Sequence, residues 1–119
     1  MRAYSRNTKI ATATIASGAS LSGAVGTDVL DLVAVITPAA WTAADITFQA
    51  LYGGTTYVDC YISTADTEVT VQAGASRFIT IPAGTLSGAN SIKVRSGTAG
   101  LPVNQAAARD VTLIFGTAV

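Results

Sequence analysis

Residues 46–62 read ITFQALYGGTTYVDCYI, and their pattern decides the fold class. Apolar and polar residues alternate on both sides of Gly53 and Gly54. A period of two is typical of strands because successive side chains point to opposite faces. Glycine adopts the positive φ angles of tight hairpin turns at little cost. The stretch therefore predicts two antiparallel strands joined by a turn, and in the second strand the residues expected to face the core are Val58, Cys60 and Ile62.

The same alternation recurs along the rest of the chain. No window of eleven or more residues carries apolar side chains at helical spacing. Five further runs alternate, at residues 10–15, 68–72, 77–81, 91–96 and 110–115. Together with residues 29–37, these runs predict an all-β single domain, an antiparallel and jelly-roll-like β-sandwich of about eight strands. We expect the domain at residues 21–119 and an extended N-terminal arm at residues 1–20.

Residues 29–37, VLDLVAVIT, depart from the pattern because both faces of the strand are apolar. If the leucines, Ala34 and Ile36 face the core, then Val29, Val33 and Val35 point away from it. An antiparallel strand with one face in water alternates more cleanly. Two explanations stay open: a long loop covers a central strand, or another subunit covers it.

Two connections are longer than hairpins require. Residues 38–45, PAAWTAAD, suit one helical turn because Pro fits its start and Ala its continuation. Residues 97–109 form a long loop rich in Ala, and long ordered loops often bind a partner. Together with the outward valines, this loop supplies the candidate subunit interface, which consists of Val29, Val33, Val35, Leu101, Val103, Asn104 and Gln105.

Composition excludes several classes of chemistry. The chain has 119 residues, no histidine, one cysteine and no net charge. Imidazole catalysis and zinc sites of cysteine and histidine are therefore excluded, and we expect no enzyme, no metal and no cofactor. Cys60 follows the inward pattern and is expected to pack as a small hydrophobe. Scattered Lys and Arg residues give no field that attracts nucleic acid, and no segment is apolar enough to cross a membrane.

Aromatic side chains offer a candidate sugar platform. Small β-sandwiches often stack sugar rings on surface aromatics, and Trp41, Tyr52, Tyr57 and Tyr61 are available. The alternation in residues 57–62 places Tyr57 and Tyr61 on one outer face, so the platform is assigned to Trp41, Tyr57 and Tyr61. Ordinary cross-strand packing of these rings is the other interpretation.

The N-terminal segment carries cations without nearby acids, because the first carboxylate is that of Asp28. It lacks the continuous apolar stretch of a secretory signal. One interpretation is a solvated terminus, and the other is an arm that adds a strand to an exposed sheet edge of another chain. In the second interpretation the contact residues are Arg2, Tyr4, Arg6, Lys9, Ile10 and Ile15.

Three stretches carry a family resemblance. They are AAWTAADITFQALYGGTTYVDCY (39–61), TEVTVQAGASRFITI (67–81) and SIKVRSGTAGLPVNQAAARDVTLIF (91–115). Their shared features are Trp-Thr-x-Ala before a strand, a Gly-Gly hairpin, an Arg-Phe-Ile strand, and Arg-Ser-Gly-Thr leading to Pro-Val-Asn-Gln. In these features the chain resembles small β-sandwich virion proteins of tailed bacteriophages and prophages. The resemblance covers roughly residues 20–116, and the arm matches less.

The resemblance implies a structural role in a virion. A free chain of this size is expected to be a capsid decoration (cement) or minor capsid protein, made in the host cytoplasm and bound to the major capsid protein on the outer capsid surface. A homo-oligomer is expected, a trimer in preference to a dimer. The alternative is a tail, head-fibre or baseplate module that binds host carbohydrate. A cellular carbohydrate-binding or adhesin module is a third interpretation.

Overall fold

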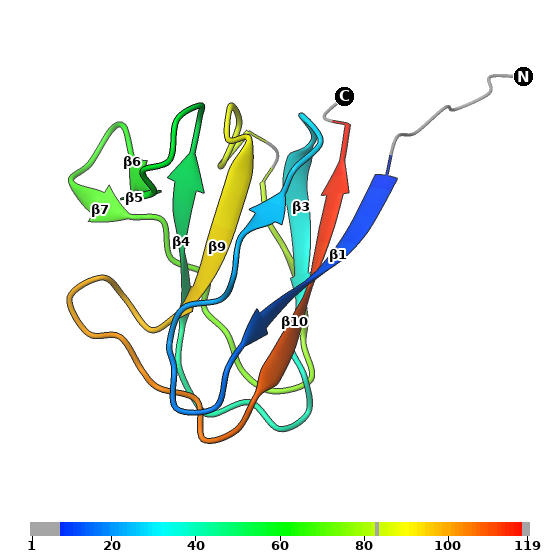
Figure 1. The fold of residues 1–119 in the computed structure, drawn as a ribbon, viewed down its shortest axis with the longest axis vertical. Coiled ribbons are helices and arrows are strands. Elements are labelled where there is room, and N and C mark those ends of the chain that lie inside the picture. The colour runs from blue at the N-terminus through cyan, green and yellow to red at the C-terminus, as the bar shows by residue number, and fades with distance from the viewer. Residues whose placement is uncertain (1–7, 83, 118–119) are drawn as a thin grey trace, which may run out of the picture.

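Ten antiparallel strands in three sheets make up the computed structural model, which describes residues 8–82 and 84–117 (Figure 1). The described residues contain no helix, so the predicted all-β single domain is confirmed, whereas the expected number of about eight strands is too low. The strands are β1 (Thr8–Ile15), β2 (Val25–Gly26), β3 (Asp31–Ile36), β4 (Ile46–Leu51), β5 (Val58–Asp59), β6 (Tyr61–Ile62), β7 (Thr67–Glu68), β8 (Phe78–Thr80), β9 (Ser91–Ser96) and β10 (Arg109–Gly116).

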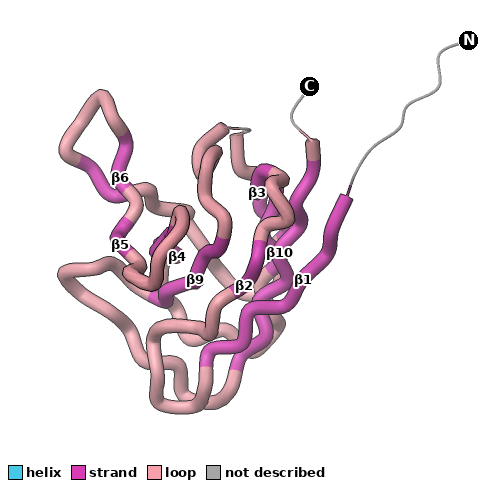
Figure 2. The backbone as a smooth tube through the Cα atoms, turned by 45° about the horizontal axis from the view of Figure 1, so that its top comes forward, coloured by secondary structure: helices cyan, strands magenta, loops and turns pink. Residues whose placement is uncertain are grey.

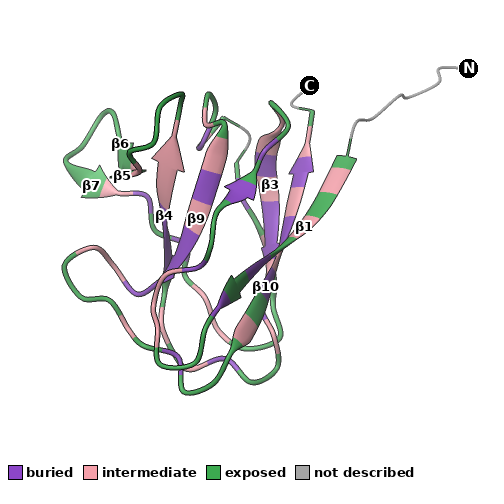
Figure 3. Ribbon diagram, in the orientation of Figure 1, coloured by how far each residue is buried: buried purple, intermediate pink, exposed green. Residues whose placement is uncertain are grey.

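Two four-stranded sheets share one core. The first has the order β1-β10-β3-β8 and the second the order β2-β9-β4-β5. Ile46 and Phe48 of β4 and alternate residues of β9 and β10 are buried, and Figure 3 shows the buried bands along these strands. Phe48 and Phe115 are the largest of the fully buried side chains and come from different sheets. Apolar burial between the two sheets therefore holds the domain together.

The first strand belongs to the domain and not to an arm. β1 pairs with β10 through eight consecutive partners, from Thr8 opposite Gly116 to Ile15 opposite Arg109. Every second side chain of β1 points inward, so Ala13 and Ile15 are buried in the core. Residues 8–15, which were expected in an arm, instead form an edge strand, and Ile15 is a core residue and not a partner contact. Arg2, Tyr4 and Arg6 lie outside the described residues.

A β-bulge explains the two apolar faces of residues 29–37. In the pairing with β10, Leu32 lies opposite Phe115 and Ala34 opposite Ile114, so Val33 is an extra residue without a direct partner. An extra residue shifts the alternation by one, which lets both Leu32 and Val35 face the core. The prediction that Val35 points outward is therefore wrong, since its side chain is fully buried. Val33 is half-buried within the bulge.

The hairpin around Gly53 and Gly54 is confirmed, but its second strand is interrupted. β5 pairs with β4, and both glycines have positive φ. The chain leaves the sheet at Cys60, and β6 pairs with β7 as a separate hairpin that projects from the body of the protein (Figure 2). Val58 and Ile62, predicted to face the core, are exposed as a result. This break, together with the short strand β2, raises the count to ten.

The connection at residues 38–45 contains turns and no helix. Trp41 is buried there, and its indole Nε1–H donates to Ala44 O at 3.0 Å. The predicted helical turn is therefore wrong. A buried ring with its polar atom satisfied anchors this loop to the core.

Candidate functional site

The two large sheets close on one side and stay open on the other. On the closed side β1 contacts β2 and β9 of the other sheet. Lys9 Nζ donates to Gly26 O at 2.8 Å and lies 3.1 Å from Asp28 Oδ2. On the other side β5 and β8 are the outermost strands of their sheets and do not pair with each other. We call this second side the open side.

Three adjoining hollows follow the open side. The first, of about 400 Å³, lies between β5, β6 and residues 85–89, and we call it the tyrosine hollow because Tyr52 and Tyr61 line it. The second, of about 370 Å³, lies between residues 69–72 and residues 79–82, and we call it the edge hollow. The third, of about 410 Å³, includes Tyr61, Ile62 and Thr85 and joins the other two. The open side is thus a continuous concave surface.

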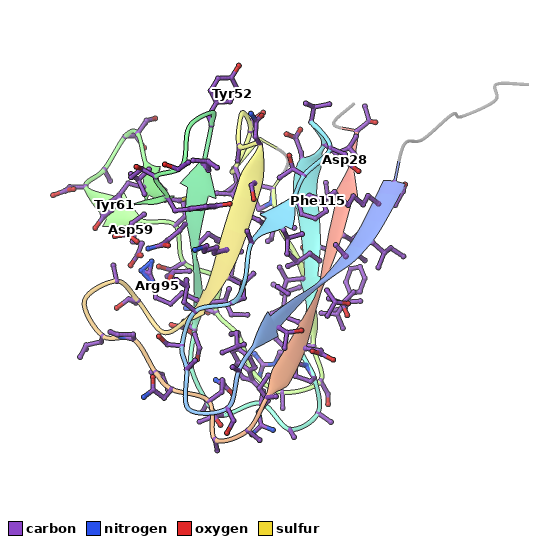
Figure 4. The ribbon with its side chains drawn as sticks, viewed as in Figure 1. Asp28, Tyr52, Asp59, Tyr61, Arg95 and Phe115 are labelled. Atoms are coloured by element: carbon purple, nitrogen blue, oxygen red, sulfur yellow. The ribbon has the colours of Figure 1, made fainter. Side chains whose placement is uncertain are left out.

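The tyrosine hollow combines exposed aromatic and aliphatic side chains. Tyr52 is 80% exposed and Tyr61 54% exposed, and Val58 between them is also exposed. Leu86 forms its apolar floor, and Asp59 contributes a carboxylate. Figure 4 shows Tyr52 pointing away from the body of the protein and Tyr61 close to Asp59. Such amphipathic rings suit contacts with a sugar ring or with a protein side chain.

A buried ionic cluster lies beside this hollow on the outer face of the second sheet. Arg95 of β9 is only 7% exposed at its side chain, and its Nη1 donates to Asp59 Oδ1 at 2.9 Å. Its Nη2 lies 3.7 Å from Glu68 Oε2 of β7. Glu68 Oε1 accepts a hydrogen bond from the Ala99 N–H at 3.0 Å. The cluster therefore ties the β6–β7 hairpin and the loop after β9 to the sheet (Figure 4).

Cys60 lines the tyrosine hollow as a protonated thiol. Partial burial raises its pKa to about 11, and the nearby carboxylates of Asp59 and Glu68 raise it in the same direction. A thiol with so high a pKa carries almost no thiolate at neutral pH and is a poor nucleophile. Cys60 packs against the core, as the sequence predicted.

Gln105 is buried and holds the long loop in place. Its Nε2 donates to Ser96 Oγ at 2.7 Å and to Thr42 O at 3.0 Å, and its Oε1 accepts from the Thr42 N–H at 2.8 Å. Its backbone N–H donates to Ala19 O at 2.9 Å. A fully buried amide with these partners cannot contact another subunit, so the assignment of Gln105 to an interface is wrong.

The three residues of the predicted sugar platform do not come together. Trp41 is buried under its own loop. The Tyr57 hydroxyl donates to Ser91 Oγ at 2.7 Å, and Lys93 Nζ lies 4.5 Å from the centre of its ring. Only Tyr61 lines the tyrosine hollow, with Tyr52 as its aromatic neighbour. Sequence reasoning missed this pair because it treated residues 57–62 as one regular strand.

The remaining predicted contact residues lie on separate parts of the surface. Val29 is 90% exposed in the turn before β3, Leu101 is 78% exposed in the loop after β9, and Ile10 is exposed on β1. Asn104 is exposed and Val103 half-buried. The structure therefore keeps Val29, Leu101 and Ile10 as exposed apolar groups but does not join them into one surface.

Hydrogen bonds within the 97–102 loop fix the backbone at Leu101. Gly97 has a φ of +89°, and a side chain there would collide with Leu101 O. Thr98 N–H donates to Leu101 O at 3.1 Å, and Leu101 N–H donates to Thr98 Oγ1 at 3.0 Å. These contacts set where the exposed leucine leaves the loop.

The described chain offers neither a metal-binding cluster nor a membrane-spanning helix. Within residues 8–82 and 84–117 no group of three or more Cys, Asp or Glu side chains is placed to hold a metal ion. No helix that is long and apolar enough to span a membrane is found in the same residues. Comparison with protein-family models, with curated proteins and with solved structures finds no match to this chain.

Proposed function

We propose that this chain is a non-enzymatic structural protein of a phage virion that binds the outer capsid surface and stabilises the head. The observation that carries the proposal is the set of large apolar side chains exposed to water on different segments of a small domain, such as Val29, Leu101, Phe78 and Ile10. Isolated exposed hydrophobic residues are common, but several on one small domain suit a protein surrounded by neighbours. The resemblance to virion proteins supports the same role.

We also propose that the two large sheets form a β-sandwich of the jelly-roll type. The strand orders β1-β10-β3-β8 and β2-β9-β4-β5 place chain neighbours such as β1 and β2, or β3 and β4, in different sheets. This alternation supports a jelly roll, an architecture used by viral capsid and lectin domains. The architecture alone does not assign a function, so the argument rests on the exposed residues.

Among these residues Val29 gives the strongest argument for a partner contact, because its backbone is strained. Its φ is +54°, and the preceding Asp28 has a φ of +53°. A β-branched residue in the left-handed region is a true outlier, and strain retained in an exposed turn points to a function. A valine that costs stability and is 90% exposed is explained if a partner covers it.

The first prediction tests this residue. Val29→Asn should raise the free energy of unfolding by about 1 kcal/mol, because Asn tolerates left-handed backbone and Val does not. The same change should weaken co-sedimentation with capsids assembled from the major capsid protein of the same genome, and Leu101→Asn should do so without a change in stability. Thr64→Asn, in the exposed β6–β7 turn, is the control and should leave binding unchanged. Full capsid binding by the Val29→Asn Leu101→Asn double variant would refute the docking role of these residues.

The alternative proposal is a tail, head-fibre or baseplate module that binds host carbohydrate, and the tyrosine hollow favours it. Tyr61→Ala and Tyr52→Ala should each abolish retention on immobilised host glycans while the melting temperature stays within about 2 °C, because both rings are exposed and surface substitutions change stability little. Tyr57→Phe lies outside the hollow and serves as the control. Unchanged retention in both tyrosine variants would exclude this hollow as a sugar site.

A further inference from the structure

We infer that the edge hollow is a binding slot for one extended peptide strand supplied by another protein chain. Its two walls are strand edges from different sheets, β8 on one side and residues 69–72 on the other. Each wall presents backbone N–H and C=O groups that have no backbone partner among the described residues. A strand placed between them would complete both edges.

The first wall is the free edge of β8. Thr37 N–H donates to Arg77 O and Ile81 N–H donates to Val33 O, both at 2.9 Å. Alternate residues of an antiparallel strand direct their backbone groups to the same neighbour, so Ile79 also faces β3. The backbone groups of Phe78 and Thr80 therefore point away from β3, toward the open side, where no strand of the described chain pairs with β8.

The second wall continues the edge of the second sheet. Val69 N–H donates to Cys60 O at 2.8 Å, and Val71 exchanges two hydrogen bonds with Ile46, at 2.8 and 2.9 Å. By the same alternation, the N–H and C=O of Thr70 point away from that sheet, and Thr70 lines the edge hollow. Among the described residues neither group has a backbone partner.

The side chains that line the slot are all uncharged, and those that form its floor are apolar. Its lining residues are Ile62, Val69, Thr70, Val71, Gln72, Ile79, Thr80, Ile81, Pro82 and Thr85. Val69, Val71 and Ile81 are buried and form its floor. A charged side chain placed there would lose water without gaining a partner. The uncharged slot therefore suits an uncharged segment.

These features select a peptide over other ligands. Both walls present donors and acceptors in the alternating pattern of a strand edge, and only another backbone repeats that pattern. Backbone bonds would supply affinity, and an apolar side chain at every second position would fill the floor. The expected occupant is therefore an uncharged extended segment with β-branched residues at alternate positions. This inference does not depend on the virion role, although a neighbouring subunit would be a natural donor.

The probe is a capped peptide of seven alternating valines and threonines, followed by one lysine for solubility. Hydrogen exchange followed by NMR on the full chain supplies the readout. In the free protein the Ile79 amide should exchange slowly, and the amides of Thr70, Phe78 and Thr80 should exchange at least 10-fold faster. Saturating peptide should slow exchange at those three amides by at least 10-fold and leave the amides of β1 unchanged.

Two controls distinguish backbone pairing from non-specific apolar binding. A peptide with N-methylated threonine amides keeps the side chains, but its methyl groups replace the donors of one edge and block close approach of a wall there, so it should protect the amides of at most one wall. In the protein, Thr80→Pro removes an N–H that points into the slot and leaves the bonds of β8 to β3 in place. It should weaken peptide affinity about 3- to 10-fold relative to Thr80→Ala.

Three results would overturn the inference, and none of them needs a protein variant. They are protection of Thr70 and Thr80 already in the free protein, equal binding of the N-methylated peptide, and peptide-induced changes confined to the tyrosine hollow. Loss of capsid or glycan binding in the variants of the preceding subsection would not bear on it, because none of those residues lines the slot.

Discussion

Deletion of residues 2–15 should abolish the folded state, whereas deletion of residues 2–7 should leave it intact. The longer deletion removes β1, its eight pairings with β10 and the buried side chains of Ala13 and Ile15. Burial of one large aliphatic side chain contributes about 1.5–3 kcal/mol, and the exposed flank of β10 adds a further loss. A domain of this size is stable by only about 5–15 kcal/mol.

Circular dichroism during heating measures this difference. The longer deletion should show no cooperative transition, and the shorter one should melt within about 2 °C of the full chain. The shorter deletion also tests the remaining part of the predicted arm, because it removes Arg2, Tyr4 and Arg6 and spares β1. Cooperative melting of the 2–15 deletion at the temperature of the full chain would show that β1 is an arm after all.

Arg95→Ala should lower the free energy of unfolding by about 3–5 kcal/mol, the usual cost of leaving buried charges without their partner. Its guanidinium is the cation within reach of both Asp59 and Glu68, and Glu68 is only 11% exposed at its side chain. Without it, two carboxylates face each other beneath the β6–β7 hairpin. The loss should therefore include local opening of that hairpin.

Urea denaturation followed by tryptophan fluorescence measures the loss. Lys93→Ala is the matched control, because Lys93 is a cation on the same strand and face that contacts the Tyr57 ring and no carboxylate in the described residues. It should cost less than about 1 kcal/mol. A loss for Arg95→Ala no larger than that for Lys93→Ala would mean that the cluster contributes little to stability.

Period-two alternation predicted the large sheets well because one face of each strand is buried. Residues 46–51 and 91–96 became β4 and β9, and Phe48 and Val94 lie in the core. The bulge at Val33 could not be predicted, since it arises from pairing with β10 some 80 residues away. The same holds for the break at Cys60, which depends on where β7 pairs.

The candidate site was harder to predict than the fold, because its residues meet only through long-range packing. Gln105 and Trp41 are residue types that often lie at surfaces or interfaces, but here buried partners satisfy their polar atoms. Arg95 lies on the face of β9 that points away from the core. Glu68 and the loop at Ala99 cover the Arg95 side chain, and the sequence around Arg95 gives no sign of either partner. The slot depends on which backbone groups stay unpaired, and sequence periodicity carries no information about that.

The pairing of β1 with β10 has a consequence for biosynthesis. Thr8–Ile15 is synthesised about 100 residues before its partner Arg109–Gly116. At a synthesis rate of about 5–20 residues per second, the nascent β1 waits on the order of 5–20 seconds for its partner. The pairing of β1 with β10 therefore forms late, whereas β3 and β8 of the same sheet can pair before β10 is made.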